Sequence, residues 1–139
     1  MTEDNARRNA ADEVNRADTC LQEARALQAA GFPYGAVSRA YYAVFHAARA
    51  LLFLIGIESH THKTLVSLIG EHYVRSGRLS AAMGRLVSRL QRDREDADYA
   101  AGAVFTPDEA ARTISEAERF VDAARLLIQA SPTRQGNAE

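Results

Sequence analysis

The feature that most constrains the fold is SRAYYAVFHAARALLFLIG, residues 38–56, a segment that is apolar on nearly every side when it is drawn as a helix. Such a helix is stable only if other elements cover most of its circumference. A membrane span would also explain an apolar run, but His46 and Arg49 lie in the middle of this one, where lipid would penalise them. The segment therefore predicts the central helix of a helical bundle.

Glycine and proline residues divide the chain into helical segments, and strand patterns are almost absent. Thr61, Ser80 and Thr106 are candidate N-caps, and Pro33 fits the first turn of a helix. The expected helices cover residues 3–30, 33–55, 62–76, 80–99 and 107–130. Helices joined by short connections pack as antiparallel neighbours. The sequence therefore predicts an all-α fold, an antiparallel up-and-down bundle of about five helices.

Length and composition bound the domain organisation. A chain of 139 residues fits one domain, which we place at residues 1–130. Residues 131–139 are expected to form a disordered tail, because they offer no apolar anchor. Cys20 is the only cysteine, which excludes an intramolecular disulfide and indicates a reducing compartment. The N-terminus has no apolar core of the kind a signal peptide requires, so we expect a cytoplasmic location.

Two polar side chains interrupt the central helix at a spacing of seven residues. Arg39 and His46 fall within about 20° of the same line along a helix, on a stripe that is otherwise rich in small residues. One interpretation is a helix edge, with Arg39 reaching water along its stem and His46 hydrogen-bonded to a neighbour. The other is a polar cleft lined by both side chains, and spacing alone leaves the two open.

A second polar cluster, RDREDADY, residues 92–99, ends the fourth expected helix. Arg94 projects towards the interior, beside Met83 and Val87, and a buried guanidinium requires a carboxylate or a bound anion. Asp98 lies one helical turn further on and is the candidate partner. An ion pair within the fold and an anion site therefore both remain open.

Arginine side chains also gather on another face of this helix. A helical projection aligns four of them: Arg78, Arg85, Arg89 and Arg92. Residues 75–94 contain six arginines and one acidic residue, although the formal net charge of the whole chain is -1. Arginine can bind phosphate through two nitrogen atoms at once, so this face is a candidate RNA-binding surface. A solvated helix face is the alternative.

Signals for metal or cofactor chemistry are weak. His60 and His62 are two residues apart, a spacing that suits metal ligands only in an extended segment, and no cysteine or acidic cluster lies nearby. The sequence contains no GxGxxG, P-loop or GxSxG motif. We therefore expect neither a metal site nor a cofactor, and we place His62 in the first turn of the third helix.

The chain resembles the HEPN superfamily of small helical proteins in three consecutive elements. These are SRAYYAVFHAARALL, a helix that begins at the Thr61–His62 pair, and REDADY from Arg94 to Tyr99. The similarity covers roughly residues 10–128 and is most specific for the group with the S-R-x-Y-Y-A-x-F-H signature. It implies a helical bundle that forms a homodimer, binds RNA and, in many members, cleaves RNA without a metal ion as the toxin of a toxin–antitoxin pair. It also implies a partner, a minimal nucleotidyltransferase that neutralises the toxin by adenylylating a tyrosine.

The family's catalytic signature, R-x(4–6)-H, guides the assignment of site residues. An arginine can stabilise the charge that builds on phosphorus, and a histidine can transfer protons near neutral pH. The resemblance implies Arg39, His46 and Arg94 as candidate catalytic residues and Tyr99 as the hydroxyl open to modification. Binding or supporting roles fall to Tyr42, Asp98, Arg85, Arg89 and Arg92.

This sequence departs from the family pattern at one position. In better-studied members the motif lies late in the chain, but here Asp98 stands about where the histidine belongs, between Arg94 and Tyr99. Arg39 and His46 match the motif by spacing, on an earlier helix. Either Arg94 and His46 meet across packed helices, or the protein binds a nucleotide or its partner without cleaving RNA. A purely architectural bundle is a third hypothesis.

Overall fold

The computed structural model describes residues 2–99 and 105–131, without the side chains of residues 97 and 99. In chain order the elements are α1 (Glu3–Ala29), α2 (Pro33–Leu54), α3 (His62–Ile69), the π-helical segment η1 (Gly70–Val74), α4 (Ala81–Tyr99) and α5 (Pro107–Ala130). The described residues contain no strand, so the all-α prediction is confirmed. Apart from Ser131, the tail predicted to be disordered lies outside the described residues.

Local sequence signals set the helix ends where the sequence predicts them. Thr61 and Thr106 each accept a hydrogen bond from the backbone N–H three residues further on, and Glu109 completes a capping box at the start of α5. Ser80 caps α4 in the same way. Pro33 occupies the first turn of α2, where its missing N–H costs no hydrogen bond.

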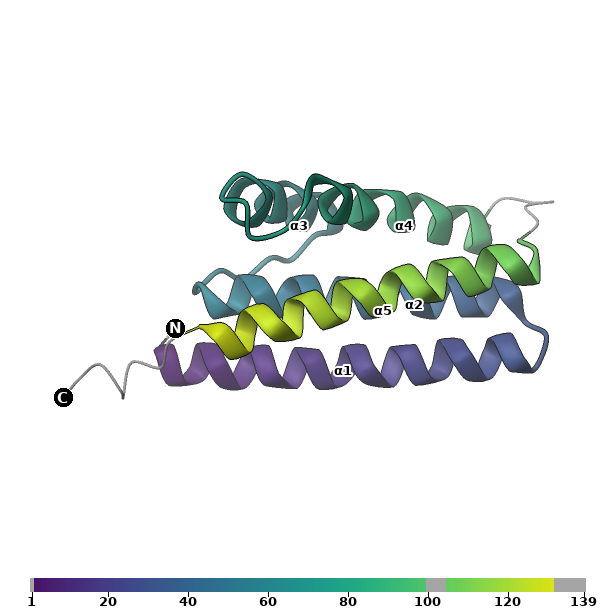
Figure 1. The fold of residues 1–139 in the computed structure, drawn as a ribbon, viewed down its shortest axis with the longest axis horizontal. Helices are drawn as coiled ribbons and strands as arrows, with labels where there is room; N and C mark the ends of the chain where they lie inside the picture. Colours follow the sequence, from purple (N-terminus) through teal and green to yellow (C-terminus); the bar gives the residue numbers. More distant parts are fainter. Residues whose placement is uncertain (1, 100–104, 132–139) are drawn as a thin grey trace.

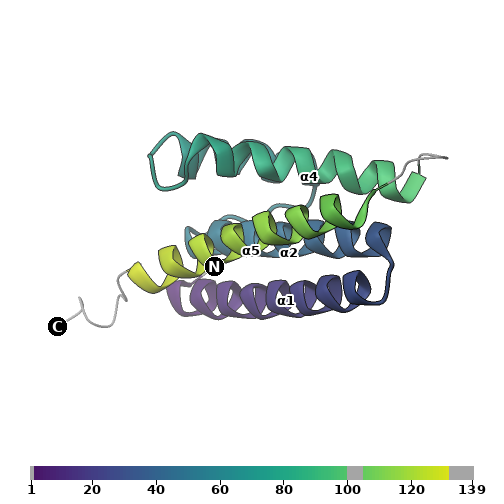
Figure 2. The ribbon, with the colours of Figure 1, turned by 45° about the vertical axis from the view of Figure 1, so that its right-hand side comes forward.

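The helices form layers around α2. Figure 1 shows α1 and α4 running in one direction and α2 and α5 in the other, with α3 and α4 on the side of α2 that faces away from α1. The turned view in Figure 2 keeps the same order. α2 packs against each of the other four α-helices, and 12 of its 22 residues are buried. The prediction that α2 is the central helix is therefore confirmed. No described helix has both the length and the apolar character that a membrane span would require.

Alanine dominates the contact between α1 and α2. Ala17 and Ala24 of α1 and Ala36, Ala43 and Ala47 of α2 are completely inaccessible to solvent. Small side chains allow two helices to approach closely, and the packed interior leaves little room for larger ones. This close approach brings the polar side chains of α1 within reach of those of α2.

One carboxylate lies buried at this interface. Glu13 of α1 is 2% exposed, and its oxygens lie 2.6 Å from Arg16 Nη1, 2.7 Å from His46 Nδ1 and 3.7 Å from Arg49 Nη1. Burial by itself would raise the pKa of Glu13, but the hydrogen bond from His46 and the charges of Arg49, His46 and Arg16 outweigh it, so the pKa is lowered. An ionised Glu13 therefore links α1 to α2.

The third helix differs from the single helix expected over residues 62–76. It changes from α to π geometry at Gly70, and the π-helical segment places the Tyr73 ring in the core. The Tyr73 hydroxyl donates a 2.5 Å hydrogen bond to the carbonyl oxygen of Leu51, in the last turn of α2, where carbonyl groups lack partners within their own helix. Burial raises the pKa of Tyr73 to about 12. A tertiary hydrogen bond thus accompanies a helix irregularity that local sequence signals do not encode.

Two glycines provide a matched test of how η1 packs on α4. A Cβ atom added at Gly84 would lie 2.7 Å from Val74 Cγ2, whereas one added at Gly70 would meet nothing within 4 Å. Because valine is stiff at χ1, Gly84→Ala is expected to lower the free energy of unfolding by about 1–3 kcal/mol. Gly70→Ala is expected to leave it unchanged or raise it by up to about 1 kcal/mol. Urea unfolding measures both, and adding Val74→Ala to Gly84→Ala should restore part of the loss. Equal effects of the two alanines would contradict this packing.

Replacement of Glu13 tests the buried carboxylate. Glu13→Gln is expected to lower the free energy of unfolding at neutral pH by about 2 kcal/mol, because charge-assisted hydrogen bonds are lost. The pKa of Glu13 is lower in the folded chain than its ordinary value of 4.5. Its contribution to stability is therefore complete above pH 4.5 and disappears as the pH falls through the pKa of the folded chain.

Denaturant unfolding at neutral and at acidic pH measures this contribution. The difference in the free energy of unfolding between wild type and Glu13→Gln should shrink below pH 4.5. Glu118→Gln is the control, since Glu118 pairs with Arg25 at the surface and should change stability by less than about 1 kcal/mol. A pH-independent loss in Glu13→Gln would argue against an ionised Glu13.

Candidate functional site

Three of the predicted site residues, Arg39, Tyr42 and His46, lie along one side of α2, which we call the α2 strip. It consists of five partly exposed residues: Arg39, Tyr42, Phe45, His46 and Arg49. Helix α1 borders the strip on one side, where Arg39 Nη1 lies 3.4 Å from Glu23 Oε1. Helix α4 borders it on the other, where the Arg94 guanidinium lies over Tyr42. The strip therefore lies between an acidic side chain of α1 and a basic side chain of α4, and it retains access to solvent.

Arg94 points into the protein, as the helical projection predicts. Its side chain is 13% exposed, and Nη1 lies 2.9 Å from Asp98 Oδ2, so the predicted ion pair is present. The guanidinium also lies 5.3 Å from the ring centre of Tyr41 and 5.7 Å from that of Tyr42. Aromatic faces favour a cation at this range.

Arg39 and Arg94 come together at one aromatic ring. The Arg39 guanidinium lies 4.7 Å from the centre of Tyr42, the same ring that Arg94 approaches from α4. The two arginines are far apart in the sequence and belong to different helices. The structure thus brings the two predicted motifs into one place, with both cationic side chains close to the Tyr42 ring.

His46 lies further along the strip and turns towards α1. Its Nδ1 donates to Glu13, since an ionised carboxylate can only accept a hydrogen bond. With Asn15, Arg16, Thr19 and Cys20, His46 lines a shallow depression of about 310 Å³. Arg39 does not line this depression and pairs with a different glutamate, Glu23. The two side chains of the sequence motif therefore share a helix face but not this hollow.

The structure adds a histidine that the sequence assigned no role at the site. His62 begins α3, and its Nδ1 atom is hydrogen-bonded to the Tyr41 hydroxyl. The imidazole centre lies 4.8 Å from that of Phe45 and 5.5 Å from that of Tyr41. Burial and the positive charge of Arg94 lower the pKa of His62. The N-cap at Thr61 could place His62 in a first turn, but no local signal indicates that this turn faces α2.

Burial also acts on the tyrosine between His62 and Arg94. Tyr41 is 2% exposed, and desolvation raises the pKa of its phenol, although the charge of Arg94 opposes the change. Tyr41 therefore remains a neutral phenol over the physiological range. A neutral hydroxyl can donate or accept a hydrogen bond, so it can orient the imidazole in either protonation state.

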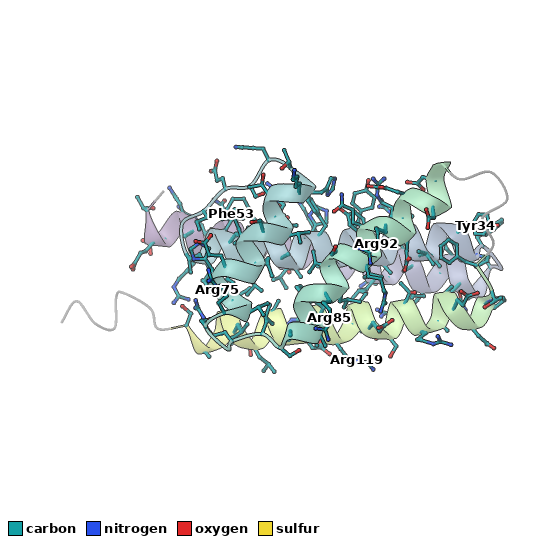
Figure 3. All side chains as sticks on the ribbon, turned by 90° about the horizontal axis from the view of Figure 1, so that it is seen from above. Tyr34, Phe53, Arg75, Arg85, Arg92 and Arg119 are labelled. Carbon is teal, nitrogen blue, oxygen red and sulfur yellow. The ribbon has the colours of Figure 1, made fainter. Side chains whose placement is uncertain are left out.

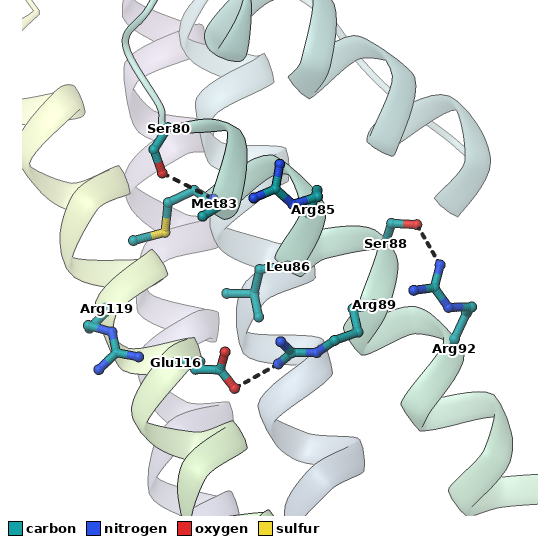
Figure 4. A pocket seen from close by; sticks show the side chains of 10 residues that line it. Ser80, Met83, Arg85, Leu86, Ser88, Arg89, Arg92, Glu116 and Arg119 are labelled. Carbon is teal, nitrogen blue, oxygen red and sulfur yellow. Dashed lines mark hydrogen bonds and ion pairs between the residues drawn. The ribbon is translucent and has the colours of Figure 1, made fainter.

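A second cationic region lies between α4 and α5, in a groove of about 540 Å³. Figure 3 places Arg85, Arg92 and Arg119 on this side of the molecule. Arg89 reaches across the groove to Glu116, with 2.7 Å between Nη2 and Oε1 (Figure 4). We call this region the α4–α5 groove. It brings together the three predicted α4 arginines and a fourth, on α5, that the sequence analysis missed.

Two predicted residues fall outside these arrangements. Arg78 does not continue the α4 stripe, because α4 begins only at Ala81, and its guanidinium lies 4.4 Å from the Tyr73 ring centre. The alignment of Arg78 with the α4 arginines is therefore wrong. Tyr99, the predicted modification site, is the last residue of α4, and its side chain lies outside the described residues. The described part of the chain contains no group of three metal-ligand side chains placed to hold an ion.

Comparison with known proteins agrees with the helical arrangement. The HEPN domain family model matches residues 10–127. A UPF0332 protein of Thermotoga maritima is 30% identical over 114 residues, which cover 82% of this chain and 86% of the relative. A protein of Methanocaldococcus jannaschii named "Putative toxin MJ0605" is 38% identical over 94 residues, 68% of this chain and 69% of the relative. A third relative, UPF0332 protein glr0978 of Gloeobacter violaceus, is 34% identical over 118 residues, 84% of this chain and 94% of its own. The chain therefore belongs to the HEPN family.

Proposed function

We propose that this protein is a toxin-type HEPN effector that binds RNA and cleaves it without a metal ion. The observation that carries the proposal is the position of Arg39 and Arg94, whose guanidinium groups lie 4.7 and 5.7 Å from the centre of the Tyr42 ring. Two cations beside a partly exposed aromatic ring suit a nucleotide, whose phosphate would lie near the cations. The word toxin in the names of two Methanocaldococcus jannaschii relatives supports the biological role.

Cleavage of RNA by its own 2′-hydroxyl fits these side chains. Attack on phosphorus builds negative charge on the phosphoryl oxygens, which Arg39 and Arg94 would stabilise. Proton transfer near neutral pH suits an imidazole, and His46 on the α2 strip is the candidate predicted from the sequence. These side chains together would supply the charge stabilisation and proton transfer that the reaction needs.

The α4–α5 groove would hold another part of the RNA strand. It is lined by four arginines, Arg85, Arg89, Arg92 and Arg119, and by one carboxylate, Glu116. Contacts of arginine with phosphate are independent of base sequence and weaken as salt concentration rises. The groove would therefore contribute affinity rather than sequence preference.

Two protein partners belong to the proposal on the basis of the family resemblance. A second copy of the chain would form a homodimer, and a minimal nucleotidyltransferase would silence the toxin by adding AMP to Tyr99. Phosphate carries negative charge and would draw on the same arginines that bind RNA. We propose that both interactions take place in the cytoplasm.

A second candidate function is a binding module that does not cleave RNA. The observation in its favour is that each predicted catalytic side chain has an acidic partner: Arg39 with Glu23, His46 with Glu13 and Arg94 with Asp98. A bound phosphate would compete with these carboxylates. Under this alternative the same residues would hold a nucleotide or the nucleotidyltransferase.

A cleavage assay in EDTA tests the proposal. Purified wild-type protein, checked by intact mass for AMP on Tyr99, is incubated with total cellular RNA beside Arg94→Met and the control Arg75→Met. Arg75 is exposed and lies outside both the α2 strip and the α4–α5 groove. Wild type and Arg75→Met should cleave, whereas Arg94→Met should lose about 100-fold or more in rate, because charge stabilisation is lost.

The outcome separates the two candidate functions. Unmodified wild-type protein that binds labelled RNA in a gel-shift assay but leaves it intact would favour the binding module. Full activity in Arg94→Met would refute the role assigned to Arg94. Circular dichroism of each variant confirms that the helical fold is retained.

A further inference from the structure

His62, Tyr41 and Arg94 form a linked arrangement contributed by three different helices. The His62 imidazole on α3 is hydrogen-bonded to Tyr41 on α2, and the Arg94 guanidinium on α4 lies 5.3 Å from the centre of the Tyr41 ring. His62 is partly exposed, whereas Tyr41 is buried. The arrangement therefore holds an imidazole at the edge of the core, beside the arginine that the proposed function assigns to phosphate.

We propose that His62 is the general base of the RNA cleavage reaction and that Tyr41 is its positioning residue. The inference rests on the proposed function, keeps Arg39 and Arg94 in their roles, and moves the proton-accepting role from His46 to His62, which supplies the histidine that the late motif lacks. Asp98 occupies that position on α4 and pairs with Arg94, so α4 contributes the cation without an imidazole. His62, on α3, is hydrogen-bonded to Tyr41, the tyrosine whose ring the Arg94 guanidinium also approaches.

The surroundings of His62 favour the neutral imidazole, which is the form that a general base requires. The groups that face it are Tyr41 from α2 and Arg94 and Glu95 from α4. Desolvation and the charge of Arg94 lower the pKa of His62, and Glu95 opposes the change. A neutral imidazole is therefore present at neutral pH and persists below its ordinary pKa of 6.5.

The geometry leaves one nitrogen of His62 for the substrate. Nδ1 is engaged by the Tyr41 oxygen, and within the described part of the chain Nε2 has no hydrogen-bond partner. When Nδ1–H donates to that oxygen, the lone pair of the neutral ring lies on Nε2. His46 differs, because its Nδ1 is held by Glu13 and its ring lines a hollow on the α1 side.

The proposed step balances in atoms and charge. Nε2 of His62 takes the proton of a ribose 2′-hydroxyl while O2′ forms a bond to the adjacent phosphorus. The bond from phosphorus to the 5′-oxygen breaks, and the departing oxygen takes a proton from water. The products are a 2′,3′-cyclic phosphate and a 5′-hydroxyl end, with the hydroxide from water neutralised by the proton that His62 then releases.

Two histidines two residues apart make a matched pair of variants. His62→Gln keeps a hydrogen-bonding side chain but cannot transfer the proton, and His60→Gln alters an exposed residue outside the arrangement. In the EDTA assay, His62→Gln should lose about 100-fold or more in rate, the usual contribution of a general base. His60→Gln should retain wild-type activity.

The pH profile distinguishes proton transfer from packing. Activity of wild type should fall on the acid side at a pH below 6.5, as the base becomes protonated. The midpoint should equal the pKa of His62 measured by NMR of its imidazole protons. Tyr41→Phe keeps the ring and removes the hydrogen-bonding oxygen, so it should lower the rate and shift this acid limb together with the NMR value.

Each result bears on a different claim. Cleavage by wild type with full activity in His62→Gln, or an acid limb that does not follow His62, would overturn the inference and leave the ribonuclease function intact. Absence of cleavage by unmodified wild type would overturn both. Because the comparison of the acid limb with the NMR titration uses wild-type protein, it remains decisive even if a variant fails to fold.

Discussion

The burial of α2 is the constraint on which the rest of the structure depends. A helix that is apolar on most sides cannot remain in water, and here four other α-helices contact it. Their placement leaves the α2 strip partly open, between α1 and the α3–α4 layer. Side chains that need water are tolerated there, which explains why Arg39, His46 and Arg49 occur in an otherwise apolar helix. The polar strip is thus a consequence of how the apolar surface is covered.

The close packing of α1 on α2 through alanine residues buries Glu13 beside cationic side chains. A carboxylate that is 2% exposed would be costly alone, and three cationic or imidazole side chains surround it. The exposed fractions of these side chains are 62% for Arg16, 20% for His46 and 28% for Arg49, so the cations keep part of their hydration while the carboxylate loses its own. The loss of hydration therefore falls mainly on the Glu13 carboxylate, which gains several hydrogen-bonding or charged partners in return. This division makes an ion cluster tolerable inside a helix interface.

The sequence predicts features that depend on neighbours along the chain. The caps at Thr61 and Thr106 and the pairing of Arg94 with Asp98 act over three or four residues, and each is present. The π-helical segment could not be predicted, because it accompanies a hydrogen bond from Tyr73 to a carbonyl on another helix. The position of His62 beside Tyr41 depends in the same way on how α3 meets α2.

The arginines of the α4–α5 groove also divide into those that sequence spacing predicts and those that depend on how helices pack. Arg85, Arg89 and Arg92 share a helix face that their spacing reveals, whereas Arg119 joins them only because α5 packs beside α4. The helical projection aligns Arg78 with them only because it extends the helix across a segment that is not α-helical. A helical projection is valid only within the helix, and the bounds of α4 decide which arginines it can align.

The ion pair of Arg94 with Asp98 is compatible with a binding role for Arg94. Asp98 is 33% exposed, so it can regain water when another anion binds Arg94. Arg94 itself is 13% exposed and is held by two aromatic rings, so its position does not depend on the carboxylate alone. A phosphate could therefore replace Asp98 at small cost while the guanidinium stays in place. In the free protein Asp98 neutralises the charge of a nearly buried guanidinium until an anion arrives.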